Sequence, residues 1–269
     1  MPIYLVFALS LSNTTSMRAA RVVITLYAIK LGAGPFAIGM LAAAFGLLPT
    51  LLAWFVGRLS DRYGARWLLI VGAGCASVGM LLPYFAPALA LLYVAALLNG
   101  LSFAFYNVSL QHVVGIVSSR EHRTRNFSNY SLVQSVTSFL GPLVAGFAID
   151  HSGYGAACLY LVALSAIPIA MLMLWGRLLP SGSPHATSKV SLKDTLNQPG
   201  VWRVLAASSL AQSGNDLFQF YMPVYGSSVG LSASSIGSIL AAFAAAAFVI
   251  RAAMSRLLRH YGEETVLAC

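Results

Sequence analysis

Charged residues are scarce in this sequence of 269 amino acids. Asp, Glu, Lys and Arg together make up 9% of it, whereas soluble domains carry about 25%. Hydrophobic residues make up 58% and form runs long enough to cross the hydrocarbon core of a membrane. The composition therefore excludes a soluble globular domain and predicts an all-α, polytopic membrane protein.

Cysteine is also rare. The three cysteines, Cys75, Cys158 and Cys269, have no paired or metal-ligand spacing, and we interpret them as packing residues. The sequence also lacks a metal-ligand cluster, a nucleophile–base set and a glycine-rich phosphate-binding loop, so nothing in it supports an enzyme. We expect no cofactor and no metal ion. Residues 1–12 lack a basic region and a cleavage site, and we expect a membrane helix there rather than a signal peptide.

Acidic residues are outnumbered, because seven Asp and Glu face 16 Lys and Arg, for a net charge of +9. Apart from three arginines inside apolar spans, the basic residues gather in the loops and helix ends of one side, and the opposite side holds only Lys30. By the positive-inside rule, the N-terminus and the basic loops are cytoplasmic. The charge is therefore a topology signal with a weak attraction for anionic lipid, and we expect no nucleic-acid partner.

The apolar runs predict eight membrane spans, at about 3–31, 35–56, 67–85, 87–117, 127–149, 154–175, 201–225 and 233–254. Between the sixth and seventh, residues 179–200 are polar and rich in Pro, Gly and Ser, as in a linker. We expect residues 1–178 to form a six-helix half, 179–200 a cytoplasmic linker, and 201–269 the start of a second half.

The most informative motif lies between the second and third spans. Residues 57–66 read GRLSDRYGAR, and we expect a charged hairpin at the cytoplasmic surface, with glycine at both ends permitting the tight backbone. The pattern G-x-L-S-D-R-x-G-x-R resembles the loop between helices two and three of the major facilitator superfamily. The resemblance implies a cytoplasmic gating motif, which consists of Gly57, Asp61, Arg62, Gly64 and Arg66.

A second resemblance lies in the fifth span, where Gly141, Pro142 and Gly146 match the G-P-x-x-(G/A)-G segment of superfamily antiporters. Proline bends a helix and nearby glycines let a partner helix approach, so a packing kink without any role in transport direction is an equal alternative. Many proton-coupled exporters of the family carry an arginine in the fourth span, at a position that Ala96 occupies here. This departure argues against proton antiport by that route.

An internal repeat supports the same family. Residues 26–64 align without a gap on residues 224–262, so that the first two spans recur as the seventh and eighth. This is the parallel two-half plan of the superfamily, whose members have twelve spans and bind solute near the midplane between the halves. Because the sequence ends after its eighth span, we interpret it as a fragment or a truncated reading frame.

Polar residues inside spans predict the solute site, because charge in hydrocarbon is costly unless it faces a cavity or a partner. In the first span, Thr14, Arg18, Arg21 and Thr25 share one helical face. The 198-residue shift of the repeat places Thr14, Arg18 and Arg21 on Gln212, Asp216 and Gln219 of the seventh span, respectively. We expect these residues to line the central cavity, with polar packing within one half as the alternative. We further expect Asp216 to pair with Arg18, unless Arg21 or solvent screens it.

Weaker candidates for the cavity are Asn107 and Gln111 in the fourth span, Tyr130 and Gln134 in the fifth, and Asn215 beside Asp216. Each pair could equally form hydrogen bonds between helices.

These features predict a secondary transporter of a small solute, which works by alternating access with ion or proton coupling. The alternatives are a solute sensor on a transporter scaffold and an inactive fragment. We expect a multi-pass protein of the plasma (inner) membrane with a cytoplasmic N-terminus, monomeric at full length, whose partners are the solute and membrane lipid.

Overall fold

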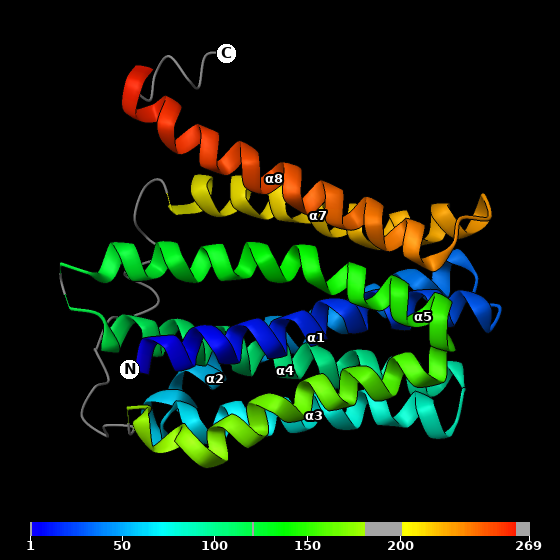
Figure 1. Ribbon diagram of the computed structural model, residues 1–269, viewed down its shortest axis with the longest axis horizontal. Coiled ribbons are helices and arrows are strands. Elements are labelled where there is room, and N and C mark those ends of the chain that lie inside the picture. The colour runs from blue at the N-terminus through cyan, green and yellow to red at the C-terminus, as the bar shows by residue number, and fades with distance from the viewer. Residues whose placement is uncertain (1, 120, 181–200, 262–269) are drawn as a thin grey trace.

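The computed structural model of the protein describes residues 2–119, 121–180 and 201–261, and every regular element in these ranges is helical (Figure 1). The α-helices are α1 (Pro2–Lys30), α2 (Pro35–Tyr63), α3 (Ala65–Phe85), α4 (Leu89–Val117), α5 (Arg123–Trp175), α7 (Val201–Ser228) and α8 (Ala233–Tyr261), and η1 (Gly176–Leu178) is a short 3-10 helix. They run roughly along one axis as a bundle (Figure 1). The all-α prediction is confirmed.

Five stretches of the described chain are long and apolar enough to cross a membrane, namely Pro35–Ser60, Ala65–Phe85, Leu89–Val117, Arg123–Leu178 and Ala233–Ile250. The fourth of these holds two predicted spans, because Gly153 breaks α5 into two helical segments with a φ of 79°. Helices α1 and α7 are not among the five, since polar residues occupy their centres. That polar character fits helices that line a site rather than face lipid.

The predicted hairpin at residues 57–66 is wrong in its extent. Helix α2 continues through the charged residues to Tyr63, and α3 begins at Ala65, so the turn consists of Gly64 alone. With φ at 81°, Gly64 adopts a conformation that other residues rarely tolerate, whereas Gly57 is an ordinary helical residue of α2. Charged side chains are excluded from lipid but not from a helix that extends into water.

Two arginines of the predicted gating motif, Arg62 and Arg66, contact different parts of the protein. The guanidinium group of Arg62 lies 5.3 Å from the ring centroid of Tyr63. The side chain of Arg66 packs against Gly176 at the end of α5, where a Cβ would lie 2.7 Å from its Nε. Asp61 belongs to the last turns of α2, and its side chain lies outside the described part of the structure. The gating role of the motif stays a prediction.

The internal repeat is visible in the helix bounds. Helix α2 begins at Pro35 and α8 at Ala233, which the repeat aligns, and Gly32 and Gly230 have matching φ values of 83° and 77° in the turns before them. Most of the predicted linker, residues 181–200, lies outside the described residues, and the division into two halves with this linker stays a prediction.

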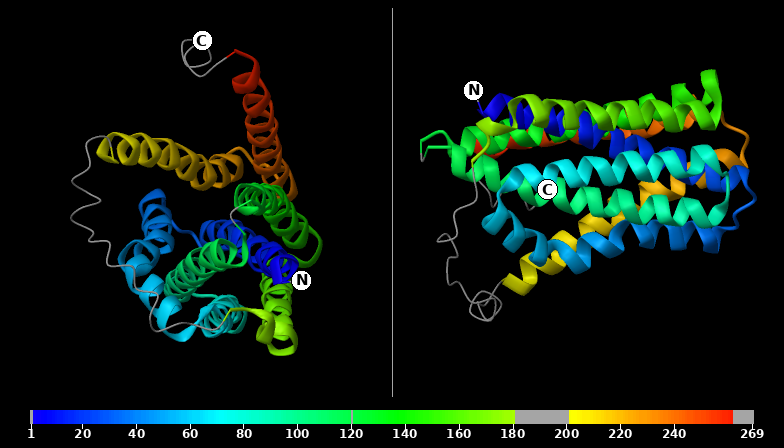
Figure 2. Two further views of the ribbon diagram at one scale, coloured as in Figure 1. Left: turned by 90° about the vertical axis from the view of Figure 1, so that its left-hand side faces the viewer. Right: turned by 90° about the horizontal axis from the view of Figure 1, so that it is seen from below.

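Helices α7 and α8 contact the other helices mainly at one end of the bundle. A buried apolar cluster there includes Ala28 of α1, Ile149 of α5 and Ile236 of α8. A second cluster, at the end that holds the N-terminus, draws its described members from α1, α3, α4, α5 and Leu179, and none from α7 or α8. Towards that end α8 diverges from α5 (Figures 1 and 2). The pair α7 and α8 is therefore packed on the other helices at one end of the bundle, and α8 is separated from α5 at the other.

Candidate functional site

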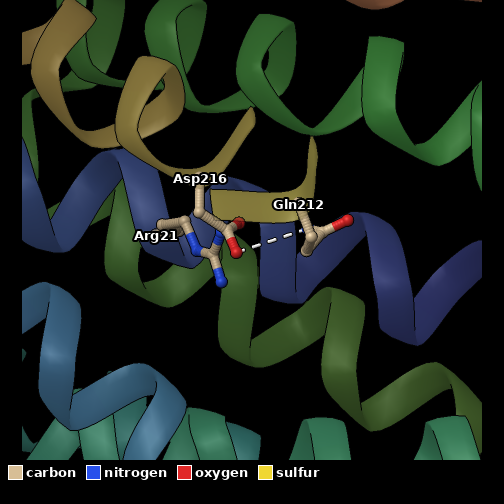
Figure 3. A network of polar contacts seen from close by, with 3 residues as sticks. All are labelled: Arg21, Gln212 and Asp216. Carbon is tan, nitrogen blue, oxygen red and sulfur yellow. Dashed lines mark hydrogen bonds and ion pairs between the residues drawn. The ribbon is translucent and has the colours of Figure 1, made fainter. Parts of the chain in front are cut away.

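Asp216 of α7 receives hydrogen bonds from two helices. Arg21 of α1 donates from Nη1 to Oδ1 over 3.1 Å, and Gln212, one turn earlier on α7, donates from Nε2 to Oδ2 over 3.3 Å. Figure 3 shows the three side chains converging where α7 passes α1. The side chains of Arg21 and Asp216 are 28% and 42% exposed, so the pair is only partly buried.

The sequence predicts Arg18 as the partner of Asp216, and the structure corrects this: the guanidinium group in contact with the carboxylate is that of Arg21. Helix α5 explains the difference. A Cβ on Gly141 of α5 would lie 2.6 Å from the Cβ of Arg18, so this face of α1 packs on α5. Arg21 lies about 60° further round α1, because successive helical residues are about 100° apart, and it faces α2 and α7.

Two phenyl rings that contact each other lie beside the guanidinium group of Arg21. Its Cζ lies 4.9 Å from the ring centroid of Phe220 on α7 and 5.6 Å from that of Phe45 on α2, both within the range of cation–π attraction. Sequence reasoning missed both rings. Phe220 could have been found, because it follows Asp216 by four residues and shares its helix face, whereas no sequence pattern ties Phe45 to this place.

Three other predicted cavity residues lie on the same two helices. Thr14 is buried in α1. Asn215 and Gln219 are half-buried on α7, one residue before and three residues after Asp216. Their contact with a solute stays a prediction.

The polar pairs of the fourth and fifth spans form hydrogen bonds within their own helices. In α4, Gln111 donates to the side-chain oxygen of Asn107, and in α5, Gln134 donates to the hydroxyl group of Tyr130 over 2.9 Å. Each pair does share a helix face, as expected from its spacing. These hydrogen bonds do not join helices, and any contact of the four residues with a solute is likewise a prediction.

The motif of the fifth span, Gly141, Pro142 and Gly146, places α5 between α1 and α8. Gly141 faces α1, as described above. A Cβ on Gly146 would overlap the carbonyl oxygen of Ala233 at the start of α8, and a Cβ on Gly237 of α8 would overlap that of Pro142. Helices α5 and α8 approach this closely because both positions are glycine.

Asp150 of α5 also holds α5 against α8, because its carboxylate caps the N-terminus of α8. The backbone N–H groups of Ala233 and Ser234 donate to its Oδ1 and Oδ2 over 3.1 and 2.8 Å. N–H groups in the first turn of a helix have no partner within that helix, and the helix dipole favours a carboxylate there. No sequence pattern indicates this contact, because it joins residues 83 positions apart.

Replacing Asp150 by alanine should lower the free energy of unfolding by about 1 kcal/mol, a typical value for a helix N-cap. The loss can be measured on the purified protein in detergent by denaturant titration with circular dichroism. Asp150→Asn is the matched comparison, because its single amide oxygen can still accept one of the two hydrogen bonds, and it should therefore lose less stability than Asp150→Ala. An equal loss in both variants would contradict the capping role.

Comparison with known proteins places these features in context. The sequence matches the family described as Major Facilitator Superfamily over residues 6–269. It is 28% identical over 162 residues to the tetracycline resistance protein, class B, of Escherichia coli, which covers 59% of this chain and 39% of that protein. It is 31% identical over 172 residues to the multidrug efflux pump LfrA of Mycolicibacterium smegmatis, with 61% and 33% covered. The chain thus spans well under half the length of these relatives.

Solved structures show the same fold. A bacterial homolog of the human lysosomal transporter Spinster, in an inward-facing and occupied conformation, aligns with a TM-score of 0.68 and 17% identity, covering 97% of this chain and 62% of that one. The peptide transporter POT in complex with sulfate aligns with a TM-score of 0.60 and 17% identity, covering 83% and 49%. At such identities the likeness extends to the fold alone.

Proposed function

This chain belongs to the Major Facilitator Superfamily, and we propose that it acts as a secondary transporter, which exports small organic solutes by alternating access. The observation that carries the proposal is the Arg21–Asp216 ion pair between α1 and α7, the first helices of the two repeated units. Transporters with this two-half plan bind solute between their repeats, near the bilayer midplane.

The packing of the helices supports alternating access. Gly146, Gly237 and Asp150 hold α5 against α8 at one end of the bundle, while α8 diverges from α5 at the other (Figure 1). Helices that are packed together at one end and diverge at the other suit a rocking motion between two conformations. Rocking of α7 and α8 against α1 and α5 would provide alternating access.

Export rather than import is favoured by the relatives, which include a tetracycline resistance protein and a multidrug efflux pump. Proton coupling is favoured by Asp216. Arginine essentially keeps its proton, so in the Arg21–Asp216 pair only the carboxylate can change its charge. A proton on Asp216 would weaken the ion pair and release α7 from α1.

The proposed location is the plasma (inner) membrane, with the N-terminus and the basic loops in the cytoplasm. Reporter fusions at residues 183 and 152 should label opposite sides of the membrane, with 183 cytoplasmic. Labelling on the same side would overturn the proposed orientation.

The function is tested by expressing the chain in cells that lack their own major efflux pumps and measuring the accumulation of a panel of fluorescent organic solutes. Accumulation of at least one solute should fall below that in cells with an empty vector. Asp216→Ala, checked for equal membrane insertion, should restore it. Solute binding without any change in accumulation would instead favour a sensor and overturn the transporter proposal.

A further inference from the structure

The candidate site holds one positive and one negative charge side by side. The Arg21 Nη1 to Asp216 Oδ1 distance is 3.1 Å, and both side chains remain partly exposed. A solute that enters this site must therefore compete with an existing ion pair. The free-energy cost of breaking this ion pair depends on the charges that the solute carries.

A solute with a single charge leaves one member of the pair without its counter-charge. A carboxylate that takes Arg21 displaces Asp216, and an ammonium group that takes Asp216 displaces Arg21. Leaving a charge unpaired away from water is costly. A zwitterion avoids this cost, because its carboxylate takes the guanidinium group and its ammonium group takes the carboxylate.

The spacing of the pair restricts the zwitterion further. Because Arg21 and Asp216 are in direct contact, their new partners must also be adjacent. An ammonium group and a carboxylate on the same carbon atom meet this condition. The planar guanidinium group of Arg21 suits the carboxylate of the solute, to which it can donate two parallel hydrogen bonds. Gln212 already donates to Asp216 and keeps the Asp216 carboxylate oriented.

The two phenyl rings beside Arg21 indicate what else the solute carries. Phe45 and Phe220 lie next to each other on one side of the guanidinium group, with ring centroids 6.0 Å apart and planes tilted by 47°. This separation and tilt are within the range at which aromatic rings attract one another. An aryl group on the solute that packs against this pair of rings makes contacts of the same kind with both helices, α2 and α7.

From this geometry we propose that the site takes aromatic α-amino acids, or larger solutes that present the same unit of adjacent ammonium, carboxylate and aryl groups. The proposal rests on the proposed function, in that it names the class of solute carried. Its determinants are Arg21 for the carboxylate, Asp216 for the ammonium group, and Phe45 with Phe220 for the ring.

The test is equilibrium binding of four matched probes to the purified chain in lipid nanodiscs, measured by calorimetry. The probes are phenylalanine, phenylpropionate (no ammonium group), phenethylammonium (no carboxylate) and β-cyclohexylalanine (no aromatic ring). Phenylalanine should bind best, with each charge-deleted probe about tenfold weaker. Equal binding of phenylalanine and either charge-deleted probe, or no binding of any probe, would overturn the proposal.

Variants assign each contact. Arg21→Gln should make phenylalanine and phenethylammonium bind alike, and Asp216→Asn should do the same for phenylalanine and phenylpropionate. Phe220→Leu should make phenylalanine and β-cyclohexylalanine bind with similar affinity. Arg125→Gln, an exposed arginine near the start of α5, should change none of these ratios. Unchanged ratios in the first three variants would overturn the proposal.

Binding and transport can fail separately. If the probes bind in the expected order but phenylalanine is not exported, the transporter proposal fails and the assignment of the solute class holds. If the chain exports other solutes while the binding order is not found, the assignment fails and the transporter proposal holds.

Discussion

A valine in place of Gly146 should separate α5 from α8 at the end of the bundle where these two helices pack together. The first side-chain carbon would overlap the carbonyl oxygen of Ala233 and lie 2.9 Å from the Cα of Ser234, and backbone atoms cannot swing aside. Overpacking of this kind costs about 1–3 kcal/mol. Spin labels at His151 and Ser238, which are exposed on α5 and α8, should report a longer distance, and transport should fall because this end can no longer close.

The same substitution at Gly74 of α3 is the matched control. Apart from the adjoining residues of its own helix, no atom lies within 4 Å of a Cβ built at Gly74, so valine there should leave the label distance and the transport rate unchanged. A Gly146→Val protein with the wild-type label distance would contradict the close packing of α5 on α8.

Arg21→Gln and Asp216→Asn should each be more damaging alone than the two substitutions are together. Each single change leaves one charge without its partner beside the rings of Phe45 and Phe220. The pair is 28% and 42% exposed, so its coupling should lie between that of surface and buried pairs, at about 1–2 kcal/mol. A double-mutant cycle on the free energy of unfolding measures it.

The control cycle combines Asp216→Asn with Arg125→Gln, which makes the same chemical change at an exposed position of α5. These two effects should add without coupling. Additive effects in the Arg21 cycle as well would mean that the ion pair contributes nothing to the joining of α1 and α7.

Most helix positions could be predicted from the sequence, because a membrane span needs a run of about 20 apolar residues and such a run is a local property. The predicted eighth span begins at Ala233, where α8 begins. The end of α2 was harder to place. Charge marks the point where a chain leaves lipid, but α2 remains helical in the charged stretch and ends only at Gly64, whose φ of 81° breaks it.

The sequence by itself determined the fold class, the repeat that relates α2 to α8, and the polar faces of α1 and α7. Helical periodicity is sufficient for these, since it depends only on neighbours along the chain. Only the tertiary structure decided that Asp216 meets Arg21, that Phe45 joins them, and that Asp150 caps α8. These contacts depend on how each helix is rotated against its neighbours, and here Gly141, by letting α5 pack on the Arg18 face of α1, sets a rotation that no local pattern encodes.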